Sequence, residues 1–470
     1  MTRAEAGAIY ARGRAATVTA LLAQARRLAA LEARLAQTSQ TSSRPPSTDP
    51  PGTRRPRRRP SGRRPGGQPG HPGAHRALVP VARVSVLIPV TPTHCAYCGR
   101  RLHGTDPMPV RHQVTEVPPM HPVVTEYHLH ALACRCGTTT RAVLPPGVPA
   151  GAFGPRLQAL AAVCTGVYHL SRRTTVDLLR DLCGVTLALG SVSACEQAAS
   201  QALATPVAAA QRFVQQQPVA HVDETGWREA RHRAWLWVAA TATVTVFLVH
   251  PRRGVVAARQ LLGPFAGILT SDRWTAYRRW PLRKRQLCWA HLRRHFAAFA
   301  ELPGAAGRQG RALLAETDQL FAWWHRVRDG TLTRSTFHTY VRPLRRRVEA
   351  RLWLGSQCRH APTAATCRGI LALAPALWTF VRVPGVEPTN NTAERALRPG
   401  VLWRKRSFGC HSPTGSRFAE RMLTVATTLK QQHRNVVDYV TLACTAALRG
   451  EPVPSLLPAL PLRGIRRPAA

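Results

Sequence analysis

The stretch Val219-Ala-His-Val-Asp-Glu-Thr-Gly-Trp227 decides the fold of this chain. Its apolar beginning predicts a buried strand over 219–223 that ends at Asp223. Because side chains alternate along a strand, Asp223 and Glu224 are expected to face opposite ways, and only one of them can join a given site. Active sites of open α/β sheets collect at the carboxyl ends of strands, which makes Asp223 the candidate.

The runs that follow alternate between strand and helix up to residue 300. After a mostly helical segment, Glu394 lies in a helix begun by Asn390 or Asn391. This order predicts a multidomain α/β protein with a mixed sheet flanked by helices and a helical insertion over 301–388. The predicted elements are strands over 234–240, 243–249, 267–270 and 285–288, and helices over 255–262, 290–300 and 416–432.

Three carboxylates stand out, on Asp223, Asp272 and Glu394, because acidic residues are scarce: 23 against 66 basic ones, for a formal net charge of +43. So cationic a chain must gather carboxylates deliberately to hold the paired Mg²⁺ ions that phosphoryl transfer on a polyanion uses. Singly, the two aspartates could pair with arginines in loops, and Glu394 could close a capping box on Asn391. Together, a strand Asp, a later-strand Asp and a helix Glu after an insertion follow the layout of RNase H-like nucleotidyl transferases.

The net charge indicates a polyanionic partner, most simply nucleic acid. Nearly all the basic residues are arginine, and a GC-rich genome could explain arginine in place of lysine. Such drift does not explain why Asp and Glu are so few. No uncharged apolar run of about 18 residues occurs. The N-terminus also lacks the apolar core of a signal peptide, so we expect a soluble, cytoplasmic protein without a membrane partner.

Residues 15–37 predict one helix within an N-terminal segment over 1–43. Leu21, Leu28 and Leu35 recur with heptad spacing, and Leu31 falls at the complementary position, which makes a short coiled-coil seam. The seam predicts a homodimer or a higher oligomer. The alternative is an amphipathic helix packed on its own chain.

The segment over 44–80 is rich in Pro, Gly and Ser and predicts a disordered linker, because it has almost no apolar side chains with which to form a core. An arginine run within it favours an arm that follows DNA phosphates, although a charge run is also typical of a solvated linker. The candidate DNA contacts in this run are Arg54, Arg55, Arg57, Arg58, Arg59, Arg63 and Arg64.

Two close cysteine pairs, Cys95 with Cys98 and Cys134 with Cys136, fall in a segment over 81–150. Four thiolates can surround one Zn²⁺ tetrahedrally, and a glycine after each pair permits the tight turn that such a site needs. We therefore predict a structural zinc-binding module. The alternatives are redox-active or free thiols, or His94 in place of one cysteine.

Short helices predicted over 151–210 could form a helix-turn-helix or a small bundle. Ser193 and Glu196 have the spacing of a capping box that would open one of these helices. Residues 433–470 predict a C-terminal helix and a basic tail.

Cys288, His291 and His295 have spacings that resemble half a zinc finger, but no second cysteine pair lies nearby. The favoured interpretation is that Cys288 packs in the core while the two histidines, one helical turn apart, face DNA or the carboxylate site.

Four motifs together are similar to the insertion sequence 66 family of bacterial transposases, as are the leucine seam, the cysteine module and the linker ending Gly66-Gly-Gln-Pro-Gly-His-Pro-Gly73. The resemblance covers roughly residues 15–450. The motifs are His221-Val-Asp-Glu-Thr-Gly-Trp227, Ser271-Asp-Arg-Trp-Thr-Ala-Tyr277, Cys288-Trp-Ala-His-Leu-Arg-Arg-His-Phe296 and Asn390-Asn-Thr-Ala-Glu-Arg-Ala-Leu-Arg-Pro399.

The resemblance implies an RNase H-like catalytic domain over 211–432 in which Asp223, Asp272 and Glu394 hold two Mg²⁺ or Mn²⁺ ions. It implies strand cleavage and strand transfer on element ends and target DNA, by a bacterial, nucleoid-associated protein that could require accessory proteins encoded by the element. The alternatives are a catalytically inactive DNA-binding remnant and a general nucleic-acid-coating protein. Further predicted DNA contacts are His291, Arg293, Arg294, Arg395, Arg398, Arg404, Lys405 and Arg406.

Overall fold

The computed structural model describes residues 2–35 and 77–458 of the 470-residue chain. Among the described residues, 77–121 belong to one unit, and 2–35 together with 122–458 belong to another. The arginines predicted as a phosphate-tracking arm, at 54–64, lie outside the described residues. Within the described residues, no helix is long and apolar enough to cross a membrane.

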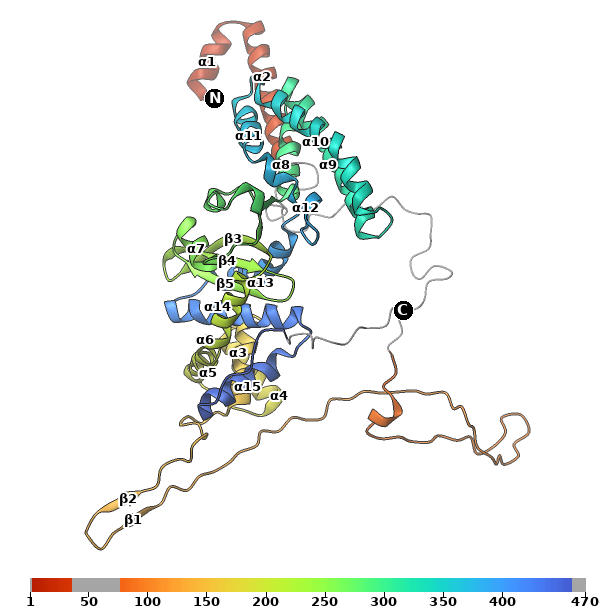
Figure 1. The fold of residues 1–470 in the computed structure, drawn as a ribbon, viewed down its shortest axis with the longest axis vertical. Coiled ribbons are helices and arrows are strands. Elements are labelled where there is room, and N and C mark those ends of the chain that lie inside the picture. The colour runs from red at the N-terminus through yellow and green to blue at the C-terminus, as the bar shows by residue number, and fades with distance from the viewer. Residues whose placement is uncertain (1, 36–76, 459–470) are drawn as a thin grey trace. The chain divides into compact units, whose positions relative to one another are not determined.

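A five-stranded mixed sheet in the order β5-β4-β3-β6-β7 is the centre of the larger unit (Figure 1). β3 pairs antiparallel with β4, and β4 with β5, whereas β3–β6 and β6–β7 are parallel pairs. The predicted mixed sheet flanked by helices is therefore confirmed. The strands are β3 (Val219–Glu229), β4 (His232–Ala240), β5 (Thr245–His250), β6 (Ile268–Ser271) and β7 (Arg285–Leu287).

Alternation along the strands divides the sheet between two hydrophobic clusters. Val222 of β3 and Trp237 of β4 belong to the larger cluster. This cluster also contains residues from helices that precede the sheet in the sequence and from helices that follow it. Leu236 of β4 belongs to a second cluster, together with Ala393 and Leu397 of the helix that carries Glu394. The helices of these two clusters are α7 (Val255–Leu262), α13 (Asn391–Ser407), α14 (Pro413–Gln431) and α15 (Val436–Arg449).

Four helices lie in residues 150–218, directly before the sheet. Three of them, α3, α5 and α6, contribute side chains to the larger cluster, and α3 and α5 also form a small cluster with α4. α15 packs against α3 and α5. α5 begins at Leu189 after Ala188, so the predicted capping box of Ser193 and Glu196 is wrong. Instead, Glu196 accepts a hydrogen bond from Arg172 of the preceding helix at 2.6 Å. The helices are α3 (Pro155–Gly166), α4 (Arg172–Cys183), α5 (Leu189–Ala202) and α6 (Ala204–Gln215).

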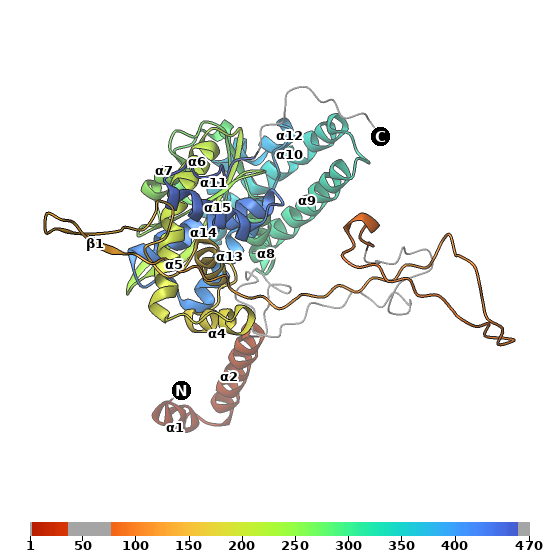
Figure 2. The same ribbon diagram turned by 90° about the horizontal axis from the view of Figure 1, so that it is seen from below.

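The helical insertion between β7 and α13 forms a third cluster. Its two longest helices, α9 and α10, run side by side in both views (Figures 1 and 2). Trp289 and Trp378 pack together at the base of this cluster with ring centroids 5.0 Å apart. The helices are α8 (Trp289–Ala300), α9 (Gly304–Arg328), α10 (Arg334–Ser356), α11 (Ala361–Leu371) and α12 (Thr379–Arg382).

Two helices, α1 (Arg3–Ala11) and α2 (Arg14–Leu35), occupy the described part of the N-terminus. Three leucines of the predicted seam, Leu21, Leu28 and Leu31, are 47–59% exposed. The side chain of Leu35 lies outside the described residues.

Candidate active site and cysteine module

Asp223 and Asp272 emerge side by side because their strands are parallel neighbours. His221 of β3 aligns with Thr270 of β6. Continuing this register by two residues brings Asp223 opposite Asp272, which directly follows β6. Asp272 therefore lies at the carboxyl end of β6, and Asp223 lies beside it within β3. The prediction that the strand ends at Asp223 is wrong, because antiparallel pairing with β4 carries β3 on to Glu229.

Glu394 enters the same region from the first turn of α13. The start of this helix is fixed by Asn390, which is fully buried. The side-chain Nδ2 of Asn390 donates to the Val222 carbonyl at 2.7 Å, and the backbone N–H of Asn390 donates to Cys288 Sγ at 3.2 Å. Neither Asn390 nor Asn391 caps the helix through its side chain, so the alternative of a capping box involving Glu394 is wrong. Asn390 instead ties the helix start to β3 beside Asp223.

The carboxylates act on one another electrostatically. Burial raises the pKa of Asp223 well above its usual value, and the negative charges of Glu224, Asp272 and Glu394 raise it further. In the described part of the chain, no arginine or lysine forms an ion pair with Asp223, Asp272 or Glu394. Arg285 and Arg273 act on Asp272 electrostatically without forming an ion pair with it. Like charges gathered in a partly buried position are costly, and a bound cation relieves that cost.

Glu224 points to the other face, as strand alternation predicts, and its charge is matched. Arg253 Nε donates to one carboxylate oxygen at 2.9 Å, and the buried Tyr277 hydroxyl donates to the other. The Arg253 guanidinium also stacks on Trp274 and Trp235, 4.0 and 4.8 Å from the ring centroids. Glu224 is therefore a structural residue that stays outside the carboxylate cluster.

Histidines near the cluster are held neutral. Burial lowers the pKa of His221 to about 4. Burial, followed by the charge of Arg273, lowers the pKa of His295 to about 4. Arg273 directly follows Asp272 in the sequence, but its Nη2 lies 3.2 Å from His295 Nε2 rather than in an ion pair with that carboxylate. His291 faces Glu394, with His291 Nδ1 and Glu394 Oε1 3.6 Å apart.

Several predicted DNA contacts have partners within the protein. Arg293 pairs with Asp318 of α9 at 3.0 Å, and Arg404 Nη1 donates to the Gly226 carbonyl of β3 at 2.7 Å. Arg294 is half-buried. Arg293 is nevertheless exposed, as are four predicted contacts on α13: Arg395, Arg398, Lys405 and Arg406.

A basic groove, which the sequence patterns did not predict, lies beside the end of α13. Its cavity volume is about 810 Å³, and no acidic residue lines it. The β3–β4 hairpin is held there by backbone bonds between Arg228 and Cys410 and between Ala230 and Cys410. The hairpin contains three arginines within the six residues 228–233, and this local density was the sequence signal that could have located the groove. The basic residues of the groove are Arg228, Arg231, Arg233, Arg404 and Lys405.

Each cysteine pair of the predicted zinc module sits in a tight turn closed by a glycine. Gly99 and Gly137 have φ angles of 70° and 88°, and their amides donate to the carbonyls of Cys95 and Cys134. Hydrogen bonds from Thr138 are the largest cause that lowers the pKa of Cys136, to about 7. Cys95 with Cys98 and Cys134 with Cys136 fall in the two separate units. A four-cysteine site therefore stays a prediction from the sequence.

Comparisons with known proteins agree with these features. Residues 150–418 match the model of the Transposase IS66 family, and residues 92–137 match the zinc-finger binding domain of transposase IS66. Residues 2–77 match a family of unknown function. The two transposase matches confirm the resemblance inferred from the four motifs. The match over residues 92–137 contains all four predicted zinc cysteines and supports a structural zinc.

One curated relative is the uncharacterized protein y4qI of Sinorhizobium fredii (strain NBRC 101917 / NGR234), which is 25% identical over 257 residues. The aligned part covers 49% of this chain and 46% of that protein. The chain therefore spans about half the length of the curated relative that it matches.

Proposed function

Because the chain belongs to the Transposase IS66 family, we propose that it is a DNA transposase that cleaves element ends and joins them to target DNA by a two-metal DDE mechanism. The observation that carries the proposal is that Asp223 and Asp272 lie opposite each other on neighbouring parallel strands, where their charges and that of Glu394 act on one another. The sheet, with three antiparallel strands followed by two parallel ones, favours an RNase H-like core.

The donor set fits Mg²⁺ or Mn²⁺, because carboxylate oxygens are the hard ligands that these ions prefer. Two such ions, when bound, supply the charge that activates the attacking oxygen and neutralises the leaving one. Asp223, Asp272 and Glu394 would hold them. Asn390 keeps the helix of Glu394 against β3, and neutral His221 adds no positive charge that would compete for the carboxylates.

The basic groove is the surface that we assign to the DNA backbone beside the cleavage site. Glu394 and Arg404 lie on the same helix, ten residues and therefore about 15 Å apart along its axis. A strand whose scissile phosphate meets the carboxylates could thus place a neighbouring phosphate near the groove. The exposed α13 side chains Arg395 and Arg398 lie between these two points.

Two further parts of the chain have proposed roles in assembly. The match of residues 92–137 supports a structural zinc in the cysteine module, with Cys95, Cys98, Cys134 and Cys136 as its proposed ligands. The exposed leucines of α2 favour self-association with a second copy of this chain through a coiled-coil seam. A shift to the monomer mass in Leu21→Glu/Leu28→Glu, measured by light scattering, would support that assignment, and an unchanged mass would overturn it.

The catalytic proposal is tested by nicking of a supercoiled plasmid in the presence of Mg²⁺. We expect Asp223→Ala, Asp272→Ala and Glu394→Ala each to lower the nicking rate by at least about 10³-fold, because each removes a metal ligand. Binding to a labelled duplex should change little, since the carboxylates do not bind phosphates directly. Asp329→Asn, which removes an exposed acid at the end of α9, is the matched control and should nick normally.

Each alternative outcome has a distinct meaning. Normal nicking by the three alanine variants would reject the carboxylate assignment. A wild-type protein that binds DNA but does not nick under any divalent metal would identify an inactive DNA-binding protein. Binding that is independent of DNA structure, without nicking, would identify a coating protein.

A further inference from the structure

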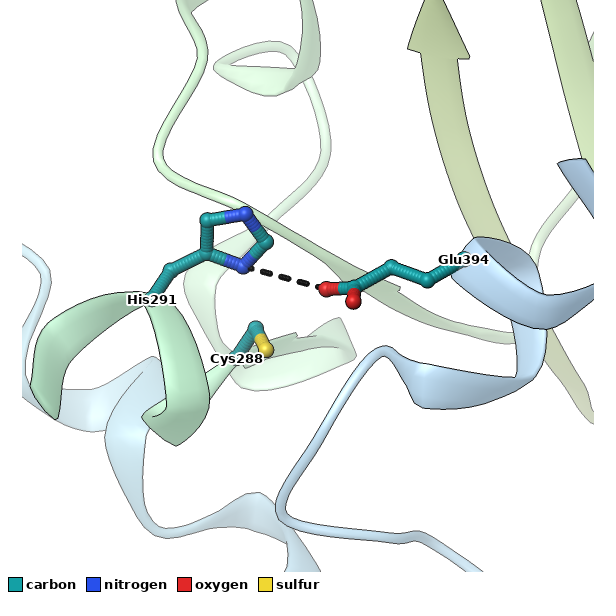
Figure 3. A group of neighbouring side chains, drawn as sticks. All are labelled: Cys288, His291 and Glu394. Carbon is teal, nitrogen blue, oxygen red and sulfur yellow. Dashed lines mark ion pairs between the residues drawn. The ribbon is translucent and has the colours of Figure 1, made fainter. Parts of the chain in front are cut away.

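Cys288, His291 and Glu394 gather their ligand atoms in one place, although they come from distant parts of the sequence (Figure 3). One atom of each, a thiol sulfur, an imidazole nitrogen and a carboxylate oxygen, lies within 4.8 Å of the others. Cys288 and His291 are three residues apart at the start of α8, a spacing that brings side chains to the same face of a helix. Glu394 approaches them from the first turn of α13.

Two of these ligand atoms lack a hydrogen-bond partner. His291 Nδ1 and Glu394 Oε1 are both buried and both without one, although they face each other at 3.6 Å. A buried polar atom that forms no hydrogen bond costs about 1–3 kcal/mol, so two in contact require an explanation. A cation between them would satisfy both atoms at once.

The spacing fits a tetrahedral zinc ion. With Zn–N and Zn–O bonds of about 2.0–2.2 Å and a Zn–S bond of about 2.3 Å, tetrahedral angles place ligand atoms about 3.3–3.6 Å apart. The His291–Glu394 distance of 3.6 Å already lies at the upper end of this range. The sulfur needs to approach by no more than about 1.5 Å.

Burial raises the pKa of Cys288 to about 11, so a bound metal has to displace the proton of the thiol. Backbone amides near the sulfur act in the opposite direction and stabilise the thiolate that metal binding leaves. Cys288 is the N-cap residue of α8, where the helix presents unpaired amides and the positive end of its dipole. The Asn390 amide donates to Cys288 Sγ at 3.2 Å. Because Asn390 immediately precedes the helix of Glu394, the same contact orients two of the three ligands.

We propose that Cys288, His291 and Glu394 form a Zn²⁺ site with three protein ligands and one open position. A ligand set of sulfur, nitrogen and oxygen selects zinc or cobalt over magnesium, whereas Asp223 and Asp272 offer only oxygen. His295 is not part of the site, because its Nε2 faces Arg273. Since Glu394 belongs to both ligand sets, zinc in this site withdraws it from the magnesium ligands, and zinc becomes an inhibitor of cleavage. Only this inhibitory consequence rests on the proposed function.

The site is tested by zinc content of the full chain without DNA. After removal of metal with a chelator, reloading with Zn²⁺ and gel filtration, we expect two zinc ions per wild-type chain, one in the cysteine module and one here. Cys288→Ser and His291→Gln should each retain one. Cys444→Ala, a buried cysteine of α15 outside both sites, is the matched control and should retain two.

The absorption spectrum of bound Co²⁺ gives a second measurement of the site, and it remains informative if one of the two variants does not fold. Co²⁺ loading should produce a sulfur-to-metal absorption band whose intensity falls in Cys288→Ser, while His291→Gln, at a partly exposed position, changes the band shape. Zinc content and spectra equal to those of wild type in both variants would overturn the proposal. Loss of the second zinc from Asp223→Ala would also overturn it, by placing that ion in the carboxylate cluster.

Inhibition is the last arm of the test. In Mg²⁺-dependent nicking, Cys288→Ser should need at least about 10- to 100-fold more Zn²⁺ than wild type for half-inhibition, because loss of a residue that only supports a metal ligand already weakens metal affinity by that much. If wild type does not nick at all, the proposed function fails while the zinc content still decides the site. If nicking is normal and equally sensitive to zinc in both proteins, the inhibitory consequence is rejected.

Discussion

Asp223 and Glu224 are adjacent carboxylates on opposite faces of β3, and their surroundings differ completely. Glu224 receives Arg253 and the Tyr277 hydroxyl, and its side chain is almost inaccessible. Burial raises the pKa of Asp223, and the charges of Glu224, Asp272 and Glu394 raise it further. In a chain with 66 basic residues, the absence of an arginine pair at Asp223 among the described residues is more informative than its presence at Glu224.

The difference separates acids that hold the fold from acids that serve a site. A buried ion pair is expensive to break, because removing one partner leaves the other uncompensated. A cluster of like charges instead destabilises the fold that contains it until a cation binds. The two faces of one strand should therefore respond in opposite directions to removal of a charge.

The largest effect on stability is expected at Glu224. Glu224→Ala should lower the free energy of unfolding by about 3 kcal/mol, because it leaves the fully buried Tyr277 hydroxyl without its acceptor and Arg253 without its charge partner. Urea denaturation followed by circular dichroism measures the change. Glu224→Gln keeps an acceptor for Tyr277 and should lose less. A variant as stable as wild type would end the structural assignment of Glu224.

The opposite sign is expected at Asp223. In the metal-free protein, Asp223→Asn should raise the free energy of unfolding at pH 7, because the folded state raises the pKa of Asp223 and therefore disfavours its charged form. The folded state holds the proton more tightly than the unfolded chain, so charged Asp223 reduces stability as pH rises above 3.8, the ordinary value of its pKa. The gain from Asp223→Asn should therefore vanish near that pH.

A dependence on metal sharpens the same comparison. Added Mg²⁺ should stabilise wild type and remove the advantage of Asp223→Asn, because a ligand that binds only the folded state shifts the unfolding equilibrium. Destabilisation by Asp223→Asn in the absence of metal would mean that the carboxylate cluster is compensated by contacts like those of Glu224.

Local patterns in the sequence predicted the central elements well. The helix expected over 255–262 coincides with α7, and the strand expected over 219–223 is the beginning of β3. Alternation along β3 also predicted correctly that Asp223 and Glu224 face opposite ways. These features depend on residues a few positions apart, and the physical signal is therefore contained in a short window.

Features that depend on distant partners could not be read in the same way. Glu196 has the spacing of a capping residue, but Arg172 of the previous helix takes its carboxylate. Arg404 belongs to a basic run that suggests DNA, yet its guanidinium supports the backbone of β3. The meeting of Cys288 with Glu394 requires the insertion to return the chain to the sheet, which no pattern within either motif specifies.

The smallest effect on stability is expected in the basic groove at the β3–β4 hairpin. Here the comparison is between exposed arginines and an arginine that is anchored within the protein. Arg231 and Arg233 are exposed and line the groove with Lys405, whereas Arg404 is anchored to Gly226. Arg231→Ala/Arg233→Ala should weaken DNA binding with little loss of stability. The slope of log affinity against log salt concentration should fall by about 1 for each phosphate that is no longer neutralised.

Arg404→Ala should behave differently, because it removes hydrogen bonds to Thr225 and Gly226 near Asp223. We expect lower stability, by about 1 kcal/mol, with a salt slope close to that of wild type. Fluorescence anisotropy of a labelled duplex between about 50 and 200 mM salt, a range over which phosphate contacts dominate, gives the slopes. A slope that falls in Arg404→Ala but not in the double variant would move the DNA-binding surface from the hairpin to α13. Equal slopes in all three proteins would leave the groove without a role in binding phosphate, and the exposed arginines of α13 would then be the next to test.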